Sequence, residues 1–437
     1  MDIRSENDKR SGYEVQMEAE ERVIVFAVAS GGVSVEDTEK SLDELEELLE
    51  TAGAATVGRL IQSLDRATSD LYLGSGKVEE LRSMVAMYDA TGVVCDDELS
   101  PAQLMNLQDA LDIKVMDRTM VILDIFAAHA GSYEGKLQVE LAQLRFRATR
   151  LVGMRDSLSR LGGGIGTRGP GEKKLEIDRR VIRDRISKLK ADLRQVEGRR
   201  TEQRKQRNRT GIPVVSIVGY TNAGKSTLLN KLTGAGVLEE DKLFATLDPA
   251  TRNAVLPAGQ QVLFTDTVGF IRKLPHHLVE AFKSTLEEAK YSDVILHVVD
   301  ASDLNWDRNM ETVYATLRQL NVDEEKDHPI ITVFNKIDKL SEDEDISTIK
   351  DLRADRMVYL SAKTGDGIDD LLVQVEEVLR EQKTYIRHTF AYQDAGKPGL
   401  IRKYGEVLTE EYLEDGIFVE AYVPKSLIGQ LGLDKNL

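Results

Sequence analysis

The 437-residue sequence contains a single cysteine, a single tryptophan and only 5% aromatic residues. One thiol, Cys95, excludes an internal disulfide and a metal site built from several cysteines. Long apolar runs are also lacking, because the run Val23 to Ala29 is far shorter than the roughly 20 residues that a membrane helix needs. The first 14 residues are polar and mixed in charge, so we expect no signal peptide and a cytoplasmic location.

Positive charge is scarce overall but concentrated in one window. The formal net charge is −17. Residues 145–210 nevertheless contain 21 Lys/Arg and 8 Asp/Glu, an excess of 13 positive charges, so the rest of the chain carries −30. Many charge runs are only solvated helix faces. An arginine-rich window within an acidic chain favours a nucleic-acid partner over that simpler interpretation.

Hydrophobic periodicity predicts an α/β protein with four parts. We expect an N-terminal α/β subdomain at 1–132 with a parallel sheet, a basic coiled-coil hairpin at 133–210, a second α/β domain at 211–383 and a small α+β domain at 384–437. In the first part, strand-like runs and amphipathic segments alternate. The runs are 22–29, 54–64, 92–95 and 113–117, and the amphipathic segments are 36–52, 75–90 and 100–111.

The hairpin is predicted from two apolar stripes on either side of a glycine-rich loop. The first stripe is Leu137, Leu141, Leu144, Ala148 and Leu151, and the second is Leu175, Ile182, Ile186, Leu189, Leu193 and Val196. The loop, GGGIGTRGPGEKK (162–174), contains the dinucleotide-type pattern G-x-G-x-x-G. A dinucleotide turn must follow a strand, whereas a predicted helix precedes this loop, so we expect it to form the hairpin tip instead.

The clearest chemical motif is the phosphate-loop pattern G-x-x-x-x-G-K-[ST] between a predicted strand and a predicted helix. Its glycines let the backbone curl around an anion, with Lys225 reaching the β- and γ-phosphates and Ser226 offering its hydroxyl to Mg²⁺. The residues expected around the phosphates are Gly219, Tyr220, Thr221, Asn222, Ala223, Gly224, Lys225, Ser226 and Thr227.

Three further motifs follow in the order that a GTPase needs, each at the end of a predicted strand. The first, Asp266, Thr267, Val268 and Gly269, would hold the Mg²⁺ shell and the γ-phosphate. In the second, Asn335, Lys336 and Asp338, the Asp338 carboxylate accepts from two guanine donors that adenine lacks. The third is Ser361, Ala362 and Lys363, in which the Ala362 N–H would meet the guanine O6.

Two residues qualify the mechanism. Phe270 stands where Ras-like enzymes carry the glutamine that orients the attacking water, so we expect slow basal hydrolysis. Asn222 resembles the phosphate-loop asparagine of potassium-activated GTPases, in which it helps to bind K⁺. An ordinary loop residue is an equally good interpretation of Asn222.

These motifs together resemble the HflX family of ribosome-associated GTPases. The resemblance is dense from 117 to 302 and is most specific in the glycine-rich tip, although Lys173 and Lys174 add charge where a less charged pair is expected. Segments that carry it are DRT (117–119), EGKLQVELAQL (134–144), GGGIGTRGPGEKKLEIDRR (162–180), GYTNAGKSTLLN (219–230), FATLDPATR (244–252), DTVGFIRKLP (266–275) and VVDASD (298–303).

The resemblance implies a monomeric GTPase that binds Mg²⁺ and the large ribosomal subunit and acts in ribosome splitting, rescue or stress. It implies that Thr246 lies in a switch segment and senses Mg²⁺ and the γ-phosphate. Lys225, Thr246 and Gly269 are then the catalytic candidates. Arg168, Lys173 and Lys174, at the hairpin tip, are the RNA-contact candidates.

Two other functions stay open at this stage. One is an ATP-driven RNA-remodelling enzyme in which the GTPase domain is regulatory, with a second nucleotide site near Leu73–Lys77. Val78 stands there where a phosphate loop needs Ser or Thr. The other is a GTPase of tRNA modification, suggested by Asn222, although no partner domain for methyl or amine transfer is visible in the chain.

Overall fold

The computed structural model describes residues 21–161, 170–234, 243–244, 250–275, 278, 288–319, 322, 328–341 and 346–433. They fall into two compact units, one built from residues up to 96 together with 103–118, the other from 97–102 together with 119 onward.

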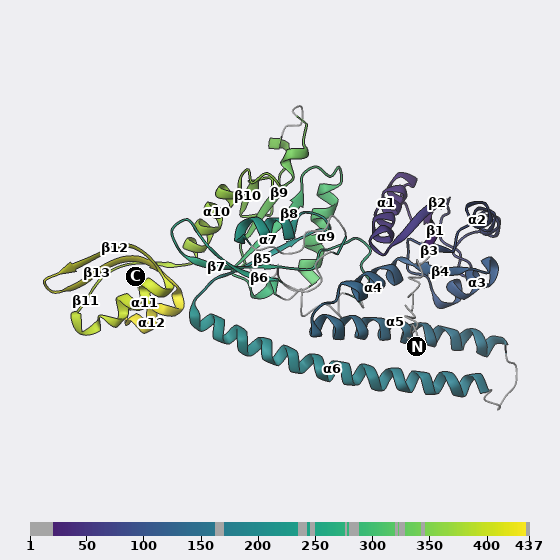
Figure 1. Cartoon of the computed structure of the whole chain (residues 1–437), viewed down its shortest axis with the longest axis horizontal. Helices are drawn as coiled ribbons and strands as arrows, with labels where there is room; N and C mark the ends of the chain where they lie inside the picture. The colour runs from purple at the N-terminus through teal and green to yellow at the C-terminus, as the bar shows by residue number, and fades with distance from the viewer. Residues whose placement is uncertain are drawn as a thin grey trace, which may run out of the picture. The chain divides into compact units, whose positions relative to one another are not determined.

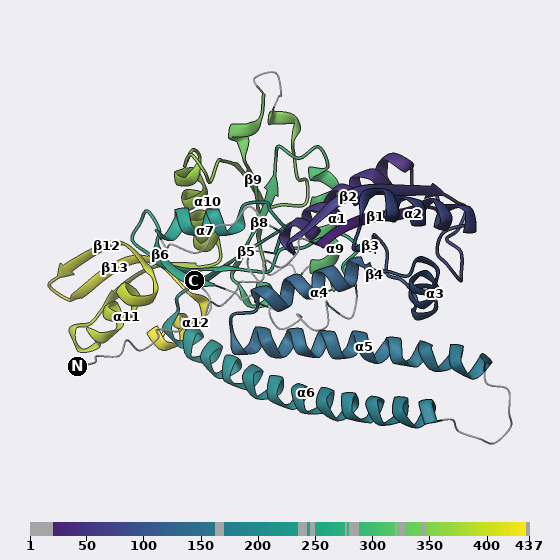
Figure 2. The ribbon, with the colours of Figure 1, turned by 45° about the vertical axis from the view of Figure 1, so that its right-hand side comes forward.

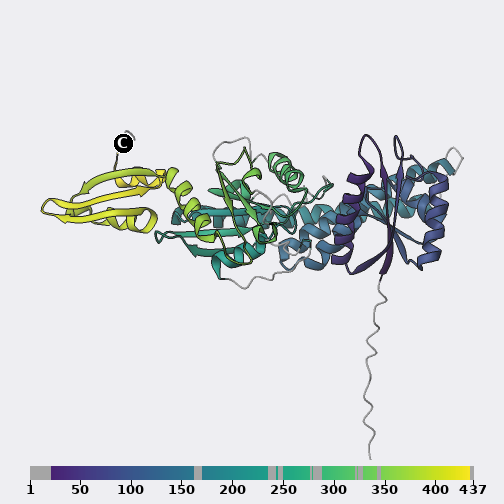
Figure 3. The same cartoon turned by 90° about the horizontal axis from the view of Figure 1, so that it is seen from above.

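The first unit is built on a four-stranded parallel sheet with the order β2-β1-β3-β4. Right-handed crossovers in this order place helices on both faces of the sheet, as Figure 3 shows. The predicted parallel α/β arrangement is therefore confirmed. The elements are β1 (Glu21–Ala29), α1 (Val35–Thr51), β2 (Ala54–Ser63), α2 (Ser75–Tyr88), β3 (Gly92–Cys95), α3 (Pro101–Leu111) and β4 (Lys114–Asp117).

A buried cluster of charged side chains, Arg118, Asp96 and Glu44, lies at the carboxyl edge of this sheet. Arg118, the first residue of α4 (Arg118–His129), is 2% exposed and donates to Asp96 at 2.8 Å and to Glu44 at 2.5 Å. Ser41 donates to the second oxygen of Asp96 at 2.7 Å. Since a buried charge is tolerated only when it is paired, these contacts fix α1, β3 and the start of α4 together. Sequence periodicity had not predicted α4.

The helices α5 (Tyr133–Leu161) and α6 (Pro170–Thr210) run side by side as an antiparallel hairpin (Figures 1 and 2). The predicted seam is confirmed between Leu137–Leu144 of α5 and Ile186–Val196 of α6. Arg185 and Glu140 add a two-point ion pair across it, with N–O distances of 2.6 and 2.7 Å. The seam residues that pack together are Leu137, Leu141, Leu144, Ile186, Leu189, Leu193 and Val196.

A six-stranded sheet with the order β10-β9-β8-β5-β7-β6 forms the centre of the second unit. All of its neighbours are parallel except β6 and β7, which are antiparallel. The edge strand β6 was missed at the sequence level. The elements are β5 (Val214–Gly219), α7 (Lys225–Thr233), β6 (Thr251–Val255), β7 (Gln261–Asp266), β8 (Val294–Asp300), α9 (Trp306–Gln319), β9 (Ile330–Asn335), β10 (Arg356–Tyr359) and α10 (Ile368–Glu381).

The apolar core of this domain lies between the sheet and the helices α7 and α10. Leu228 and Leu229 of α7 and Leu371 of α10 pack on the strand residues Ile217 and Phe264, and all five are fully buried. This packing holds the strands in register, so the segments that follow β5, β7, β9 and β10 meet at one edge. These are the segments that carry the four sequence motifs.

The C-terminal part is a three-stranded antiparallel sheet with the order β11-β13-β12 and two helices, as the predicted α+β class requires. Its own core includes Ile386, Val419 and Leu431. The elements are β11 (Thr384–Phe390), α11 (Gly396–Tyr404), β12 (Glu406–Leu413), β13 (Gly416–Val423) and α12 (Lys425–Leu431). Short 3-10 helices lie at Ala289–Tyr291, Ile337–Lys339, Ile346–Thr348 and Tyr392–Asp394.

Candidate functional site

A tight loop connects β5 to α7 at the carboxyl edge of the six-stranded sheet. Its backbone is left-handed at Asn222 (φ 58°) and Gly224 (φ 92°), and α7 begins at Lys225. A Cβ atom on Gly224 would lie 2.3 Å from Nδ2 of Asn335, so this position requires glycine. The curled loop therefore leads directly into the N-terminus of α7. Backbone N–H groups at such a loop and helix start bind anions.

Lys225 is a buried cation within this loop. Its side chain is 7% exposed, and Nζ donates to the carbonyl of Tyr220 at 2.7 Å. Burial, opposed by the carboxylate of Asp266 and reinforced by the positive charge of Lys336, lowers the pKa of the Lys225 ammonium to about 8. The ammonium is thus held in place, and an anion beside it would favour its charged form.

Ser226 and Asp266 bring two oxygen ligands together. The Ser226 hydroxyl donates to Oδ2 of Asp266 at 2.8 Å, and Asp266 is fully buried at the end of β7. Hydroxyl and carboxylate oxygens are the hard ligands that Mg²⁺ prefers beside phosphates. This donor set fits a magnesium ion. The neighbouring Thr267 hydroxyl donates to the carbonyl of Ile217 at 2.8 Å and fixes the turn after the strand.

A second loop cluster joins the ends of β9 and β10. The Asn335 side chain accepts from the N–H of Ala362 at 2.9 Å and donates to the carbonyl of Ala223 at 2.9 Å. Ser361 donates to Oδ1 of Asp338 at 2.6 Å and thereby orients that carboxylate. The motifs that the sequence placed 112 and 27 residues apart therefore form one connected structure.

Asp300 is a site residue that the sequence analysis did not single out. It ends β8, and its Oδ2 lies 2.7 Å from Nζ of Lys336. Ser302 donates to the other Asp300 oxygen through its N–H at 3.0 Å and its hydroxyl at 2.6 Å. Asp300 therefore fixes the direction of the Lys336 side chain, whose backbone is left-handed (φ 64°). The feature of the sequence that could have identified Asp300 is its place as the aspartate that ends an apolar strand.

Comparison with known proteins decides the family. A relative from Lacrimispora saccharolytica, named GTPase HflX, is 62% identical over 415 residues, which cover 95% of this chain and 96% of the relative. The chain belongs to the HflX GTPase family. The GTPases HflX of Caldanaerobacter subterraneus subsp. tengcongensis and Escherichia coli are 50% and 44% identical. They cover 92% and 82% of this chain, which in turn covers 91% and 83% of them.

Three family models agree with this assignment. They are described as GTP-binding GTPase N-terminal (residues 39–127), GTP-binding GTPase Middle Region (129–207) and 50S ribosome-binding GTPase (214–336). As a member of the HflX GTPases, the chain binds GTP and hydrolyses it to GDP and phosphate. Within the described residues, no helix is long and apolar enough to cross a membrane.

Several predicted site residues fall outside these contacts. Thr246 and Arg168 lie outside the described residues. Lys173 and Lys174 are described only by their backbone, near the start of α6. Asn222 is exposed on the phosphate loop. The structure thus brings the predicted phosphate and base motifs together, while their contacts to a nucleotide, the switch threonine and the tip residues stay predictions.

The alternative phosphate-binding segment at Leu73–Lys77 does not form a phosphate loop. Gly74 caps α2, and its N–H donates to Gln62 at 2.9 Å. The ammonium of Lys77 lies 2.8 Å from Glu80 on the same helix. Leu73 and Gly74 precede an ordinary helix and Ser75–Lys77 form its first turn, so their geometry offers no support for a second nucleotide site.

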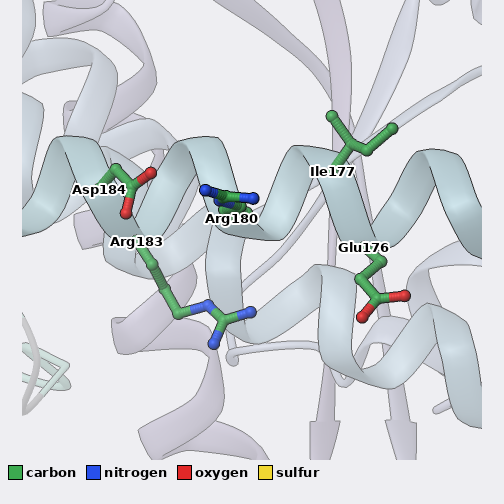
Figure 4. A pocket seen from close by; sticks show the side chains of 5 residues that line it. All are labelled: Glu176, Ile177, Arg180, Arg183 and Asp184. Atoms are coloured by element: carbon green, nitrogen blue, oxygen red, sulfur yellow. The ribbon is translucent and has the colours of Figure 1, made fainter.

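Charged side chains of α6 border a surface hollow of about 610 Å³. Figure 4 shows the side chains that line it. Ile177 and Val181, one helical turn apart, are more than 60% exposed beside it. The hollow is lined by Glu176, Ile177, Arg180, Arg183 and Asp184. The two arginines are balanced by Glu176 and Asp184, so the hollow itself is mixed in charge.

Proposed function

We propose that this HflX-family GTPase associates with the large ribosomal subunit through its hairpin and that the bound nucleotide controls the association. The observation that carries the proposal is the charge of residues 145–210, with 13 excess positive charges in a chain of net −17. Arginine-rich surfaces bind polyanionic RNA by displacing its counterions. The description of the model that matches 214–336, 50S ribosome-binding GTPase, supports the same partner. A monomer acting in the cytoplasm, where ribosomes are found, is part of the proposal.

In the proposed complex with GTP, the Lys225 ammonium contacts the β- and γ-phosphates and the Gly269 N–H contacts the γ-phosphate. Ser226 and Asp266 hold Mg²⁺, with Thr246 as a further ligand. A bound Mg²⁺ would neutralise charge on the phosphates. The remaining nucleotide contacts are assigned to Gly219, Tyr220, Thr221, Asn222, Ala223, Gly224, Thr227, Thr267, Val268, Asn335, Lys336, Asp338, Ser361, Ala362 and Lys363.

Slow basal turnover is expected because Phe270 offers no polar group to orient water. Its side chain is 2% exposed, and its carbonyl and N–H are bonded to the phosphate loop. Asn222, exposed on that loop, is assigned to a K⁺ ion beside the phosphates. Hydrolysis should then be faster in KCl than in NaCl at equal ionic strength, and Asn222→Ala should remove the difference. Equal rates of the unaltered protein in the two salts would contradict this assignment.

Control by nucleotide follows from the segment after β7. The γ-phosphate, which we assign to Gly269 and Thr246, is lost on hydrolysis, so those two contacts exist only in the GTP state. Contacts that are made in one state and lost in the other give a partner two surfaces to distinguish.

The test is co-sedimentation of the full chain with separated ribosomal subunits. We expect binding to the large subunit, stronger with a non-hydrolysable GTP analogue than with GDP. The variant R168A/K173A/K174A should bind more weakly and show a smaller dependence on salt, because fewer counterions are displaced. The matched control removes three basic side chains outside the hairpin, as R82A/R318A/K397A, and should bind like the unaltered protein.

Two results would overturn the proposal. One is the absence of sedimentation with the large subunit at moderate salt in either nucleotide state. The other is an equal loss of affinity in the hairpin variant and its control, which would mean that net charge alone, and not the hairpin, determines binding.

A further inference from the structure

The segment that follows Asp266 is bonded to the phosphate loop rather than free in solvent. The N–H of Thr221 donates to the carbonyl of Phe270 at 2.7 Å, and the N–H of Phe270 donates to the carbonyl of Gly219 at 3.1 Å. Tyr220 and Phe270 form a one-residue parallel bridge. The phosphate loop and the segment around Phe270 therefore continue the pairing of β5 with β7 past the ends of the two strands. Backbone hydrogen bonds couple the loop to that segment.

Tyr220 lies at the centre of this coupling. Its hydroxyl accepts from the N–H of Arg272 at 2.8 Å, and its carbonyl accepts from Nζ of Lys225 at 2.7 Å. One residue of the phosphate loop therefore contacts both the phosphate-loop lysine and the segment beyond Phe270. The side chains of Phe270 and Ile271 are both 2% exposed, so apolar packing holds the intervening residues.

Gly269 is packed closely against the same loop. A Cβ atom at this position would lie 2.9 Å from Cγ2 of Thr221 and 3.0 Å from Nζ of Lys225. The Gly269 backbone thus stands directly beside the lysine that is assigned to the phosphates. A displacement of a few tenths of an ångström in the segment would change the distance from the Gly269 N–H to a terminal phosphate.

We propose that Tyr220 is a positioning residue for hydrolysis: its hydroxyl holds the backbone at Arg272, and through it the Gly269 N–H, in the place where the γ-phosphate develops charge. The proposal rests on the role assigned to Gly269 above. A backbone donor that is already in place costs no reorganisation during the reaction. Since Phe270 cannot orient water, the fixed donor carries a larger part of the rate acceleration here than in an enzyme with a glutamine.

Tyr220→Phe in the full chain tests this proposal, because it removes the hydroxyl and keeps the ring. Loss of the net free energy that one hydrogen bond ordinarily contributes predicts a fall in kcat of about three- to tenfold. GDP has no γ-phosphate, so its Kd should change less than about twofold. Tyr359→Phe is the matched control: it removes a hydroxyl that donates to Ile349 at 2.7 Å in the same domain. It should leave kcat and both Kd values unchanged.

The possible results distinguish the Tyr220 proposal from the role assigned to Gly269 and from ribosome binding. An unchanged or raised kcat in Tyr220→Phe would overturn the proposal. An equal weakening of GDP and GTP-analogue binding would also overturn it, because the hydroxyl would then stabilise the phosphate loop whichever nucleotide is bound. Gly269→Ala should lower kcat strongly. If it does so while Tyr220→Phe does not, only the Tyr220 proposal fails; if Gly269→Ala has no effect, the role of Gly269 fails with it. Ribosome sedimentation is a separate measurement and is untouched by either result.

Discussion

One side chain, Asn335, joins the phosphate loop to the base loop, because its amide donates to Ala223 and accepts from Ala362, both at 2.9 Å. Asn335→Ala would leave a buried carbonyl and a buried N–H unpaired. We expect a loss of about 2–4 kcal/mol in the free energy of unfolding of this domain. Chemical denaturation followed by the fluorescence of Trp306, the single tryptophan, measures it. A change below about 0.5 kcal/mol would show that the bridge is not structural.

Base selectivity should be reversed by one substitution at Asp338. In the proposed assignment the Asp338 carboxylate accepts from the two guanine donors, whereas the amide of Asp338→Asn would donate to the oxygen that xanthine carries in place of the amino group. We expect the affinity for GTP to fall at least about 100-fold and that for XTP to rise. Binding titrations with both nucleotides measure it, with Asp369→Asn, an exposed acid on α10, as the control. Unchanged GTP affinity would refute the assigned role.

Nucleotide affinity should depend on pH through Lys225. The pKa of its ammonium is about 8 in the free protein, and contact with phosphate raises that pKa towards the ordinary value of 10.5 or above. Above pH 8, binding therefore takes up a proton, and affinity should fall by up to about tenfold per pH unit. Below pH 8 this dependence disappears.

Titrations with a GTP analogue between pH 7 and 9.5 test this expectation. Lys225→Arg is the control, because arginine stays charged over this range. Its affinity should be lower but should lack the extra slope, and comparing the two proteins removes any ionisation of the nucleotide itself. Equal slopes would contradict a low pKa of Lys225.

Stability at mildly acidic pH should depend on His297, a fully buried residue of β8. Its ring packs edge-on against Tyr314, with centroids 4.9 Å apart. Burial, opposed by Asp351 and reinforced by the positive charges of Arg353 and Lys225, lowers the pKa of the His297 imidazole to about 4. The unfolded chain, with a pKa of about 6.5, binds a proton first as the pH falls.

The free energy of unfolding should therefore fall between pH 6.5 and 4, by about 2 kcal/mol at pH 5, and show no contribution from His297 above pH 6.5. Denaturation followed at Trp306 at several pH values measures this change. His297→Phe, which keeps a ring against Tyr314, should lose that part of the dependence. A profile that is the same in both proteins would assign the pH dependence to other groups.

Local sequence patterns were sufficient for much of this protein. Continuous apolar runs predicted the parallel strands of both α/β sheets, because burial on two faces demands continuous hydrophobic segments. The heptad spacing of Leu137 and Leu141 predicted the seam that they form with Leu189. Short polar motifs at strand ends predicted the site, because the carboxyl ends of parallel strands share one edge.

What the patterns missed depends on partners distant in sequence. The strand β6 is polar and short, and it exists through its pairing with β7. His297 is a polar residue within an apolar strand, and only packing shows that it is buried against Tyr314. The helix α4 has no clear amphipathic stripe, and its first residue is fixed by the carboxylates of Glu44 on α1 and of Asp96, which follows β3.

The sequence by itself determined that this chain carries a phosphate loop, a guanine motif and a basic hairpin, because each is encoded within a few consecutive residues or one helical period. Only the tertiary structure decided that Asp300 holds Lys336, that Asn335 ties the two loops together and that Tyr220 meets Arg272. These contacts join residues 27 to 112 positions apart in the sequence, and such contacts form only when the sheet has assembled.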